Sequence, residues 1–276
     1  MFYTFRAELR LFNRVEAAVL TTLFLSVVAS LDAGVRWQSV VPGVEYSTVR
    51  VEPSPRFGDG LLHLVRIDSK VAPVIAAAVS EEGGEPLTAA AWSRKHRLAV
   101  VFNAGMYEPD HSTHTGAFSV GAHQNNAEWV EKYKSVLVGR GAGGTELIDT
   151  DGRAIKAAKA TVVAQNLRLI RRPGVNVWAQ TARAWSEAAL AVLADGRLLM
   201  VFSRTPFTMH NFNEHLLQLG LSVVEAMHLE GGPEASLSIH AGGINLDLCG
   251  SFETGFVGDD SNHHQWPLPN IFGVRQ

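Results

Sequence analysis

Two segments of the sequence place polar side chains directly after short apolar runs, where a buried strand would end. In the first, the apolar residues 98–102 are followed by Asn103, an alanine and Gly105. A side chain at the end of a buried strand is held by the sheet yet can project into a cleft, and a neighbouring glycine lets a substrate approach the backbone. This pattern makes Asn103 and Gly105 candidates for substrate binding.

The second segment, residues 227–232, reads Met-His-Leu-Glu-Gly-Gly. Successive side chains of a strand alternate between its two faces, so we expect His228 and Glu230 to share one face and the apolar residues between them to face the core. Taken singly, a glycine pair or an Asn-x-Gly is more typical of a structural turn than of a site. Each segment therefore indicates a functional site only in combination with other motifs of the sequence.

That combination has four parts in a fixed order: Asn-Ala-Gly-Met-Tyr at 103–107, Gln-Asn-Leu-Arg-Leu-Ile at 165–170, Arg183 ahead of a predicted strand, and Leu-Glu-Gly-Gly at 229–232 with Ser236 downstream. Together they resemble the phosphodiester glycosidase family, the relatives of the mannose-6-phosphate uncovering enzyme, over nearly the whole chain after its amino-terminal segment. Glu230 stands where that family more often has aspartate. Pro233-Glu234, Trp185-Ser186-Glu187 and residues 250–254 also depart from the commonest pattern, which indicates a distinct bacterial branch whose substrate is not carried over.

The resemblance implies hydrolysis of a sugar-1-phosphodiester, with release of the sugar and a phosphomonoester. A glycosidic bond usually breaks between two carboxyl groups, and the roles implied are Glu230 as nucleophile or base and Glu187 as the second carboxylate. A phosphomonoester, whose second pKa is about 6, leaves readily, so its charge must be held rather than protonated. A planar guanidinium suits this task, which implies a phosphate-binding role for Arg183. The substrate-binding residues implied are Asn103, Gly105, His228, Gly231, Gly232 and Ser236.

Each of these assignments has a structural alternative. Glu230 would otherwise cap a turn, Arg183 would form an ordinary surface ion pair, Glu187 would be a solvated strand end, and His228 would be a hydrogen-bonded strand histidine. For the protein as a whole, the alternative is a non-catalytic glycan-binding protein of the cell envelope. A serine hydrolase using Ser236 is a further alternative, but the sequence lacks a Gly-x-Ser-x-Gly motif around that residue.

No metal or cofactor is expected from the sequence. His111 and His114, like the pair His263-His264, lie in polar segments without the helical spacing of a zinc site. Asp259-Asp260 beside Asn262 lacks the spacing of an EF-hand. The expected mechanism therefore uses side chains alone.

Composition excludes one class of partner and supports a large core. The 276 residues carry a formal net charge of −3, and no run of Lys and Arg forms a basic patch. Because nucleic-acid binding depends on neutralising phosphates with a basic face, we expect no nucleic-acid partner. Hydrophobic residues make up 46% and charged residues 18%, which is typical of a folded globular domain.

The amino terminus predicts export. Arg6, Arg10 and Arg14 precede an apolar stretch over residues 17–31, and a basic flank followed by a short apolar segment and small residues is typical of a secretory signal. Cleavage after Ala29 or Ala33 would release a periplasmic or secreted protein. The alternative is a retained anchor, because the stretch is near the lower length limit for spanning a bilayer. In either case, residues 1–33 would allow at least transient membrane association.

The remaining chain predicts one domain over residues 35–276, with an α+β fold in which flanking helices cover a mixed β-sheet core. Asp195-Gly196 favours a hairpin between strands 189–193 and 198–202, and Asp151-Gly152 favours a second hairpin. Apolar residues at spacings of three and four predict a helix over 209–219 ending before Gly220. Helical composition over 87–96 and buried strands at 98–102 and 226–229 complete the expectation. The single cysteine, Cys249, cannot form an intrachain disulfide and is expected to be buried.

Overall fold

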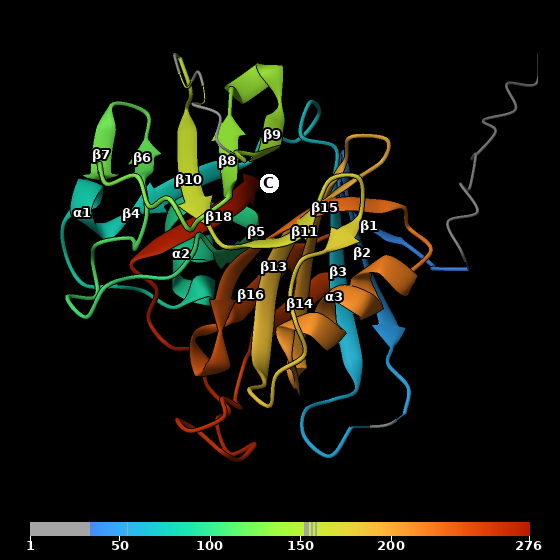
Figure 1. The fold of residues 1–276 in the computed structure, drawn as a ribbon. Coiled ribbons are helices and arrows are strands. Elements are labelled where there is room, and N and C mark those ends of the chain that lie inside the picture. The colour runs from blue at the N-terminus through green and yellow to red at the C-terminus, as the bar shows by residue number, and fades with distance from the viewer. Residues whose placement is uncertain (1–33, 54, 152–154, 156, 158) are drawn as a thin grey trace, which may run out of the picture. The chain divides into compact units, whose positions relative to one another are not determined.

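Three antiparallel sheets dominate the residues that the computed structural model describes, which are 34–53, 55–151, 155, 157 and 159–276 (Figure 1). From residue 34 onward the described residues belong to one compact unit. The predicted signal or anchor, residues 1–33, lies outside the described residues. In the part of the chain that is described, no helix is long and apolar enough to cross a membrane.

The first and largest sheet has the strand order β1-β2-β3-β14-β13-β15-β11-β12. Its strands are β1 Gln38–Val41, β2 Val44–Arg50, β3 Leu61–Ile67, β11 Arg168–Arg171, β12 Val175–Asn176, β13 Trp185–Leu193, β14 Leu198–Phe207 and β15 Val223–Gly231. The strands β13, β14 and β15 lie at its centre, and β15 carries the predicted site residues His228 and Glu230.

The other two sheets have the orders β17-β16-β5-β18-β4 and β7-β6-β10-β8-β9. Their strands are β4 Ile75–Ala78, β5 Leu98–Asn103, β6 Phe118–Val120, β7 His123–Asn126, β8 Ser135–Gly139, β9 Thr145–Asp149, β10 Val162–Asn166, β16 Ser236–Ala241, β17 Ile244–Cys249 and β18 Asn270–Arg275. The helices are α1 Val79–Glu82, α2 Ala89–His96 and α3 Met209–Gln218, with short 3-10 turns η1 Gly141–Gly143 and η2 Gly232–Glu234.

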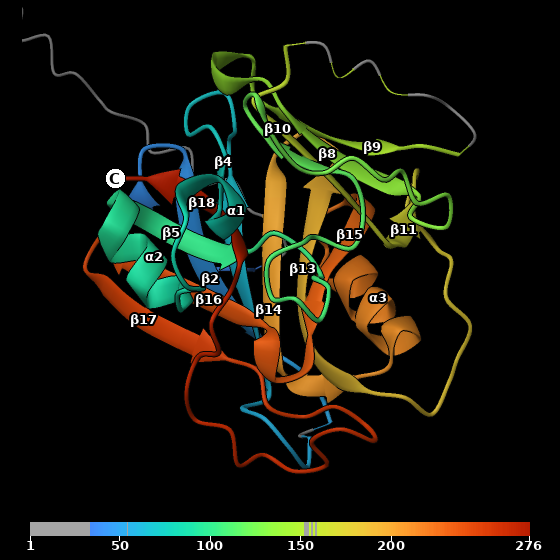
Figure 2. The ribbon, with the colours of Figure 1, turned by 90° about the vertical axis from the view of Figure 1, so that its left-hand side faces the viewer.

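The core lies between these sheets. Alternate residues of β13 face opposite ways: Leu190 belongs to the core cluster that includes Phe102 and Leu237 of the neighbouring sheet, whereas Ala191 belongs to the cluster that includes Phe212 of α3. The second sheet is covered on its other side by α2, whose Trp92 is fully buried. Figure 2 shows α2 and α3 on opposite sides, with the strands between them. Strands buried on both faces explain why so many apolar runs in the sequence are continuous.

Several predicted elements are confirmed. The hairpin at Asp195-Gly196 joins β13 and β14, with Gly196 at φ 88, a conformation that favours glycine. Helix α3 begins after Thr208, whose side chain accepts a hydrogen bond from Asn211 N–H, and Gly220 follows its end at φ 71. Cys249 is buried, and burial raises the pKa of its thiol.

The predicted mixed sheet with flanking helices is only partly correct. In the described part of the chain every neighbouring pair of strands is antiparallel. Residues in strands far outnumber residues in helices. The continuous apolar runs were interpreted as strands covered by helices. In the structure, the face of one sheet is largely covered by a second sheet. The predicted hairpin at Asp151-Gly152 is not seen among the described residues, because β9 ends at Asp149 and pairs with β8; Gly152 itself lies outside them.

Candidate active site

A cavity of about 260 Å³ lies at the carboxyl end of β15 and contains most of the side chains suited to chemistry. Its lining residues come from many separate segments of the chain: Met106, Leu167, Trp178, Arg183, Trp185, Met209, His228, Glu230, Gly231, Glu234 and Glu253. Apolar and indole side chains form part of the wall, and carboxyl groups, an imidazole and a guanidinium form the rest. Such a combination is typical of small-molecule sites.

Larger hollows exist in the described part of the protein, and the two largest of those found measure about 620 and 770 Å³. The first is lined by Phe118, Trp129 and Lys134, and the second by Arg172 and Glu225 among others. Neither contains a residue of the Leu-Glu-Gly-Gly segment or Arg183. We therefore assign the candidate active site by its chemistry, not by volume.

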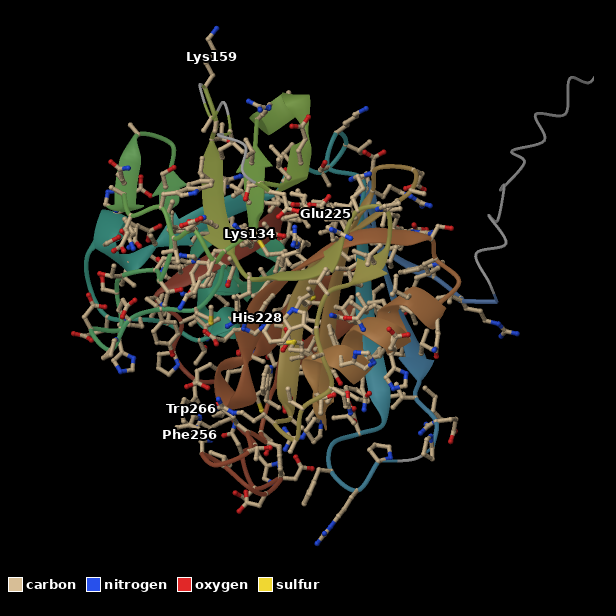
Figure 3. All side chains as sticks on the ribbon, in the orientation of Figure 1. Lys134, Lys159, Glu225, His228, Phe256 and Trp266 are labelled. Carbon is tan, nitrogen blue, oxygen red and sulfur yellow. The ribbon has the colours of Figure 1, made fainter. Side chains whose placement is uncertain are left out.

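The strand β15 delivers His228 and Glu230 to the same cavity, as alternation predicted. Leu229, between them, is fully buried in the core. A bulge supports this arrangement: His228 faces Ala189 of β13, whereas Glu230 faces the adjacent Ala188, so two steps on β15 match one on β13. Bulges redirect side chains and are common beside active sites. His228, a residue of β15, lies near the middle of the view in Figure 3.

His228 is held from behind by Glu187. Its Nδ1 lies 2.6 Å from Glu187 Oε1, and the indole of Trp185 donates to Glu187 Oε2, also at 2.6 Å. His228 is 4% exposed and Glu187 is 1% exposed. Both carboxylate oxygens of Glu187 are thus engaged inside the protein, and this residue is not part of the cavity wall. Its position does not fit the predicted second carboxylate at the bond that breaks.

Glu230 is half-buried and has a second carboxyl group nearby. One oxygen, Oε1, accepts a hydrogen bond from Gly231 N–H at 3.0 Å. Burial raises the pKa of Glu230 to about 8, with Glu234 and Glu187 adding to the rise while His228 and the Gly231 N–H oppose it. Burial together with Glu253 raises the pKa of Glu234 to about 7. Carboxyl groups with pKa values near neutrality are suited to acid–base chemistry.

The absence of side chains at Gly231 and Gly232 gives Glu234, Glu253 and Trp185 room at the end of β15. Gly232 adopts φ 64, and a Cβ at this position would lie 2.9 Å from Glu253 Oε2 and 3.4 Å from Glu234 Oε2. A Cβ on Gly231 would lie 2.5 Å from the Trp185 ring. The two glycines therefore allow carboxylates and an indole to approach the backbone at the end of β15.

Arg183 lies at the rim, on the segment that leads into β13. It lines the cavity and is exposed to solvent. Among the described residues, its side chain has no hydrogen-bond or ion-pair partner, so the surface ion pair considered as an alternative is not formed there. The guanidinium is available to a ligand.

Asn103, Ser236 and Gly105 lie behind the cavity wall. Asn103 is 1% exposed; its Nδ2 donates to Glu234 O at 3.0 Å and its Oδ1 accepts from Ser236 N–H at 2.7 Å. The Ser236 hydroxyl donates to Glu234 O at 3.1 Å. A Cβ on Gly105 would collide with the ring of His114. Asn103 and Ser236 are thus placed to hold the segment that carries Glu234, whereas Gly105 allows the close approach of His114.

Sequence reasoning missed Glu234 and Glu253 as site residues. Both lay in segments noted only for departing from the family pattern, Pro233-Glu234 and residues 250–254. The tie between Glu253 and the site is a long-range one: Glu253 forms an isolated bridge with Trp185 at the start of β13. In the described residues, no group of three or more His, Cys, Asp or Glu side chains is arranged to hold a metal ion.

Comparison with known proteins places this site in a family. The fold is similar to that of a hypothetical protein from Synechocystis, with a TM-score of 0.60 at 13% identity over 87% of this chain; the match spans 63% of that protein's chain. It is also similar to the catalytic domain of zebrafish N-acetylglucosamine-1-phosphodiester alpha-N-acetylglucosaminidase, auto-inhibited by its pro-peptide, with a TM-score of 0.56 at 11% identity over 88% of this chain and 87% of that one.

These identities establish similarity of fold alone. No match was found among curated protein sequences. The sequence model of the phosphodiester glycosidase family, however, matches residues 96–275, which include the whole of β15 and every residue that lines the cavity. The chain belongs to the phosphodiester glycosidase family.

Proposed function

We propose that the protein hydrolyses the glycosidic bond of a sugar-1-phosphodiester and releases a sugar and a phosphomonoester. The observation that carries the proposal is one cavity in which Glu230, Glu234 and Glu253 meet the imidazole of His228, with Arg183 at the rim. Carboxyl groups suit the anomeric carbon, where positive charge develops, and the two cationic groups suit the departing phosphate.

Glu230 is the proposed nucleophile or base. In its ionised form it attacks the anomeric carbon, or takes a proton from the water that does so, while the bond from that carbon to the phosphate oxygen breaks. The electron pair of that bond leaves with the phosphomonoester, and water supplies the hydroxyl that the sugar gains. Glu234 and Glu253, on the far side of Gly232, replace Glu187 as the proposed further carboxyl groups at the reacting bond.

Arg183 is the proposed clamp for the phosphate. Its planar guanidinium can donate two parallel hydrogen bonds to phosphate oxygens, which an ammonium group cannot match. Its place at the rim means that it meets the part of the substrate nearest the solvent. The sugar would then lie deeper, beside Trp178 and Trp185, whose indole rings provide flat apolar surface for a sugar ring.

The proposed substrate is a glycan of the cell envelope or of the extracellular space. This proposal rests on the export signal predicted for residues 1–33, and the protein would act as a periplasmic or secreted hydrolase.

The roles are tested by two substitutions and two substrates. Glu230→Gln keeps the shape of the side chain and removes its charge, so it should abolish turnover of both a sugar-phosphodiester and an aryl glycoside. Arg183→Lys should impair the phosphodiester by about tenfold or more and spare the aryl glycoside, which has no phosphate to hold.

The matched control is Glu225→Gln, a buried glutamate on the same strand that lies outside the cavity. It should leave both activities near wild type. Unchanged kinetics in a folded Glu230→Gln variant would remove Glu230 from the mechanism. A wild-type protein that binds glycans and cleaves neither substrate would support the glycan-binding alternative.

A further inference from the structure

The pair formed by His228 and Glu187 is the most deeply buried charged contact at the site. Glu187 accepts through both oxygens, from His228 Nδ1 and from Trp185 Nε1, each at 2.6 Å. Burial raises the pKa of Glu187, while His228 and the Trp185 indole lower it. When Glu187 is ionised it only accepts hydrogen bonds, so Nδ1 carries the proton. In the described part of the protein, the other ring nitrogen, Nε2, has no hydrogen-bond partner, and His228 lines the cavity.

The charges around the cavity give Nε2 a particular importance. The side chains that can be negative are Glu230, Glu234 and Glu253, and those that can be positive are His228 and Arg183. Arg183 lies exposed at the rim. A phosphate that reached the bond next to Glu230 would therefore meet carboxylates and one buried cation, the imidazolium of His228.

We propose that His228 is a phosphate-binding residue of the substrate pocket, whose Nε2–H donates to a phosphate oxygen, and that Glu187 is the positioning residue that orients the ring and holds its positive charge. This inference rests on the proposed function for the identity of the substrate. It adds a second donor, on the cavity wall, to the phosphate site that Arg183 forms at the rim. A neutral imidazole bonded in this way would present an Nε2 lone pair instead of a proton, which repels a phosphate oxygen.

The surroundings favour the charged form. Burial lowers the pKa of His228, but the carboxylate of Glu187 and its hydrogen bond raise it, and Glu230 and Glu253 add to the rise, so the net pKa lies above the ordinary value of 6.5. Glu234 and Arg183 also face the cavity. On the β11 side, Arg168 is engaged with Asp149 and Asp151, each at 2.8 Å. Protonated His228 therefore persists below its raised pKa and is lost as the pH rises through it.

Dimethyl phosphate is a suitable probe, because a phosphodiester keeps one negative charge across the pH range in which histidine titrates. Histidine side-chain NMR signals would be followed during titration with it, and the signal of His228 identified by its absence in His228→Gln. In the wild type, the probe should shift this signal. The affinity should fall by about tenfold or more once the pH exceeds the pKa of His228, since a hydrogen bond to a charged group is lost.

Glu187→Gln separates a positioning role from a merely structural one. Glutamine keeps the size and one hydrogen bond but removes the negative charge, so the pKa of His228 should fall. The pH at which phosphate affinity is lost should fall by the same amount. His228→Gln should bind the probe weakly at every pH.

Asp59→Asn is the matched control, because Asp59 forms a similar contact with His63, 3.0 Å from Nε2, and neither residue lines the cavity. It should change neither the pKa of His228 nor the affinity for the probe. Two results would overturn the inference: probe affinity that does not change as His228 titrates, or a loss in Glu187→Gln that is equal at all pH values. The proposed function fails separately, if the protein binds the probe as expected and cleaves no sugar-phosphodiester.

Discussion

At the scale of single residues, burial sets the protonation of two carboxyl groups in the site by raising their pKa values. Glu230 and Glu234 lie in one small cavity, and burial raises their pKa values to about 8 and about 7. A partly protonated pair repels a phosphate less than two full negative charges would. The negative charges of Glu230 and Glu234 also act on Tyr107: burial and these charges together raise the pKa of its hydroxyl.

This pKa predicts the pH dependence of the reaction. If Glu230 acts as nucleophile or base, it must lose its proton, so kcat/KM should rise with pH until about 8, the raised pKa of Glu230. The rate should fall as the pH rises through the raised pKa of His228, where its imidazolium loses the proton. The check is a profile of kcat/KM against pH with a sugar-phosphodiester. An acidic limb near 4.5, the ordinary value for glutamate, would contradict the assignment of a buried, raised pKa to the essential base.

At the scale of elements, the site depends on how strands distant in sequence are brought together. Alternation along one strand was enough to predict that His228 and Glu230 share one face, and that face opens to the cavity. The hairpin at Asp195-Gly196 and the helix before Gly220 were also readable, because both depend on local turn and capping chemistry. Glu187 and Glu253 were not, because their positions follow from the pairing of β13 with β15 and from a bridge at Trp185, which no local pattern encodes.

The segment after β15 gives a prediction at this scale. Asn103, on β5, clamps the turn η2 by bonding the backbone at Glu234 and Ser236. Asn103→Ala leaves a buried N–H without a partner, so it should lower the free energy of unfolding by about 2 kcal/mol and also lower turnover, because Glu234 loses its support.

Asn103→Asp provides the control for this prediction. It keeps an acceptor for Ser236 N–H, but when ionised it places a buried negative charge against Glu234 O, so its stability should be higher at acid pH, where the carboxyl is protonated, than at neutral pH. Thermal melts and kcat measured on the same preparations check both effects. Full activity in Asn103→Ala would show that η2 is held by other contacts.

At the scale of the whole molecule, stacked antiparallel sheets with helices on the outer faces provide a core large enough to support a buried charged pair without any disulfide, since the sequence has one cysteine. The expected α+β class missed the extent of sheet-on-sheet packing. A continuous apolar run looks the same whether a helix or a second sheet covers it, so the sequence could not separate the two.

The predicted export signal, residues 1–33, can be tested on the full-length protein in cells. Amino-terminal sequencing of the protein recovered from the cell envelope should begin near Ser30 or Gly34. The apolar segment is short for a span, which favours cleavage. A chain that begins at Met1 and sediments with membranes would instead identify a retained anchor.

The central claim is that a glycosidic bond breaks, with the phosphate as the leaving group. The most direct test is hydrolysis of a sugar-1-phosphodiester in water labelled with oxygen-18, with both products analysed by mass spectrometry and phosphorus NMR. Cleavage between the anomeric carbon and oxygen should place the label in the sugar hydroxyl and leave an unlabelled phosphomonoester. Label in the phosphate, with sugar-1-phosphate as a product, would show attack at phosphorus and contradict the roles given to Glu230 and Arg183.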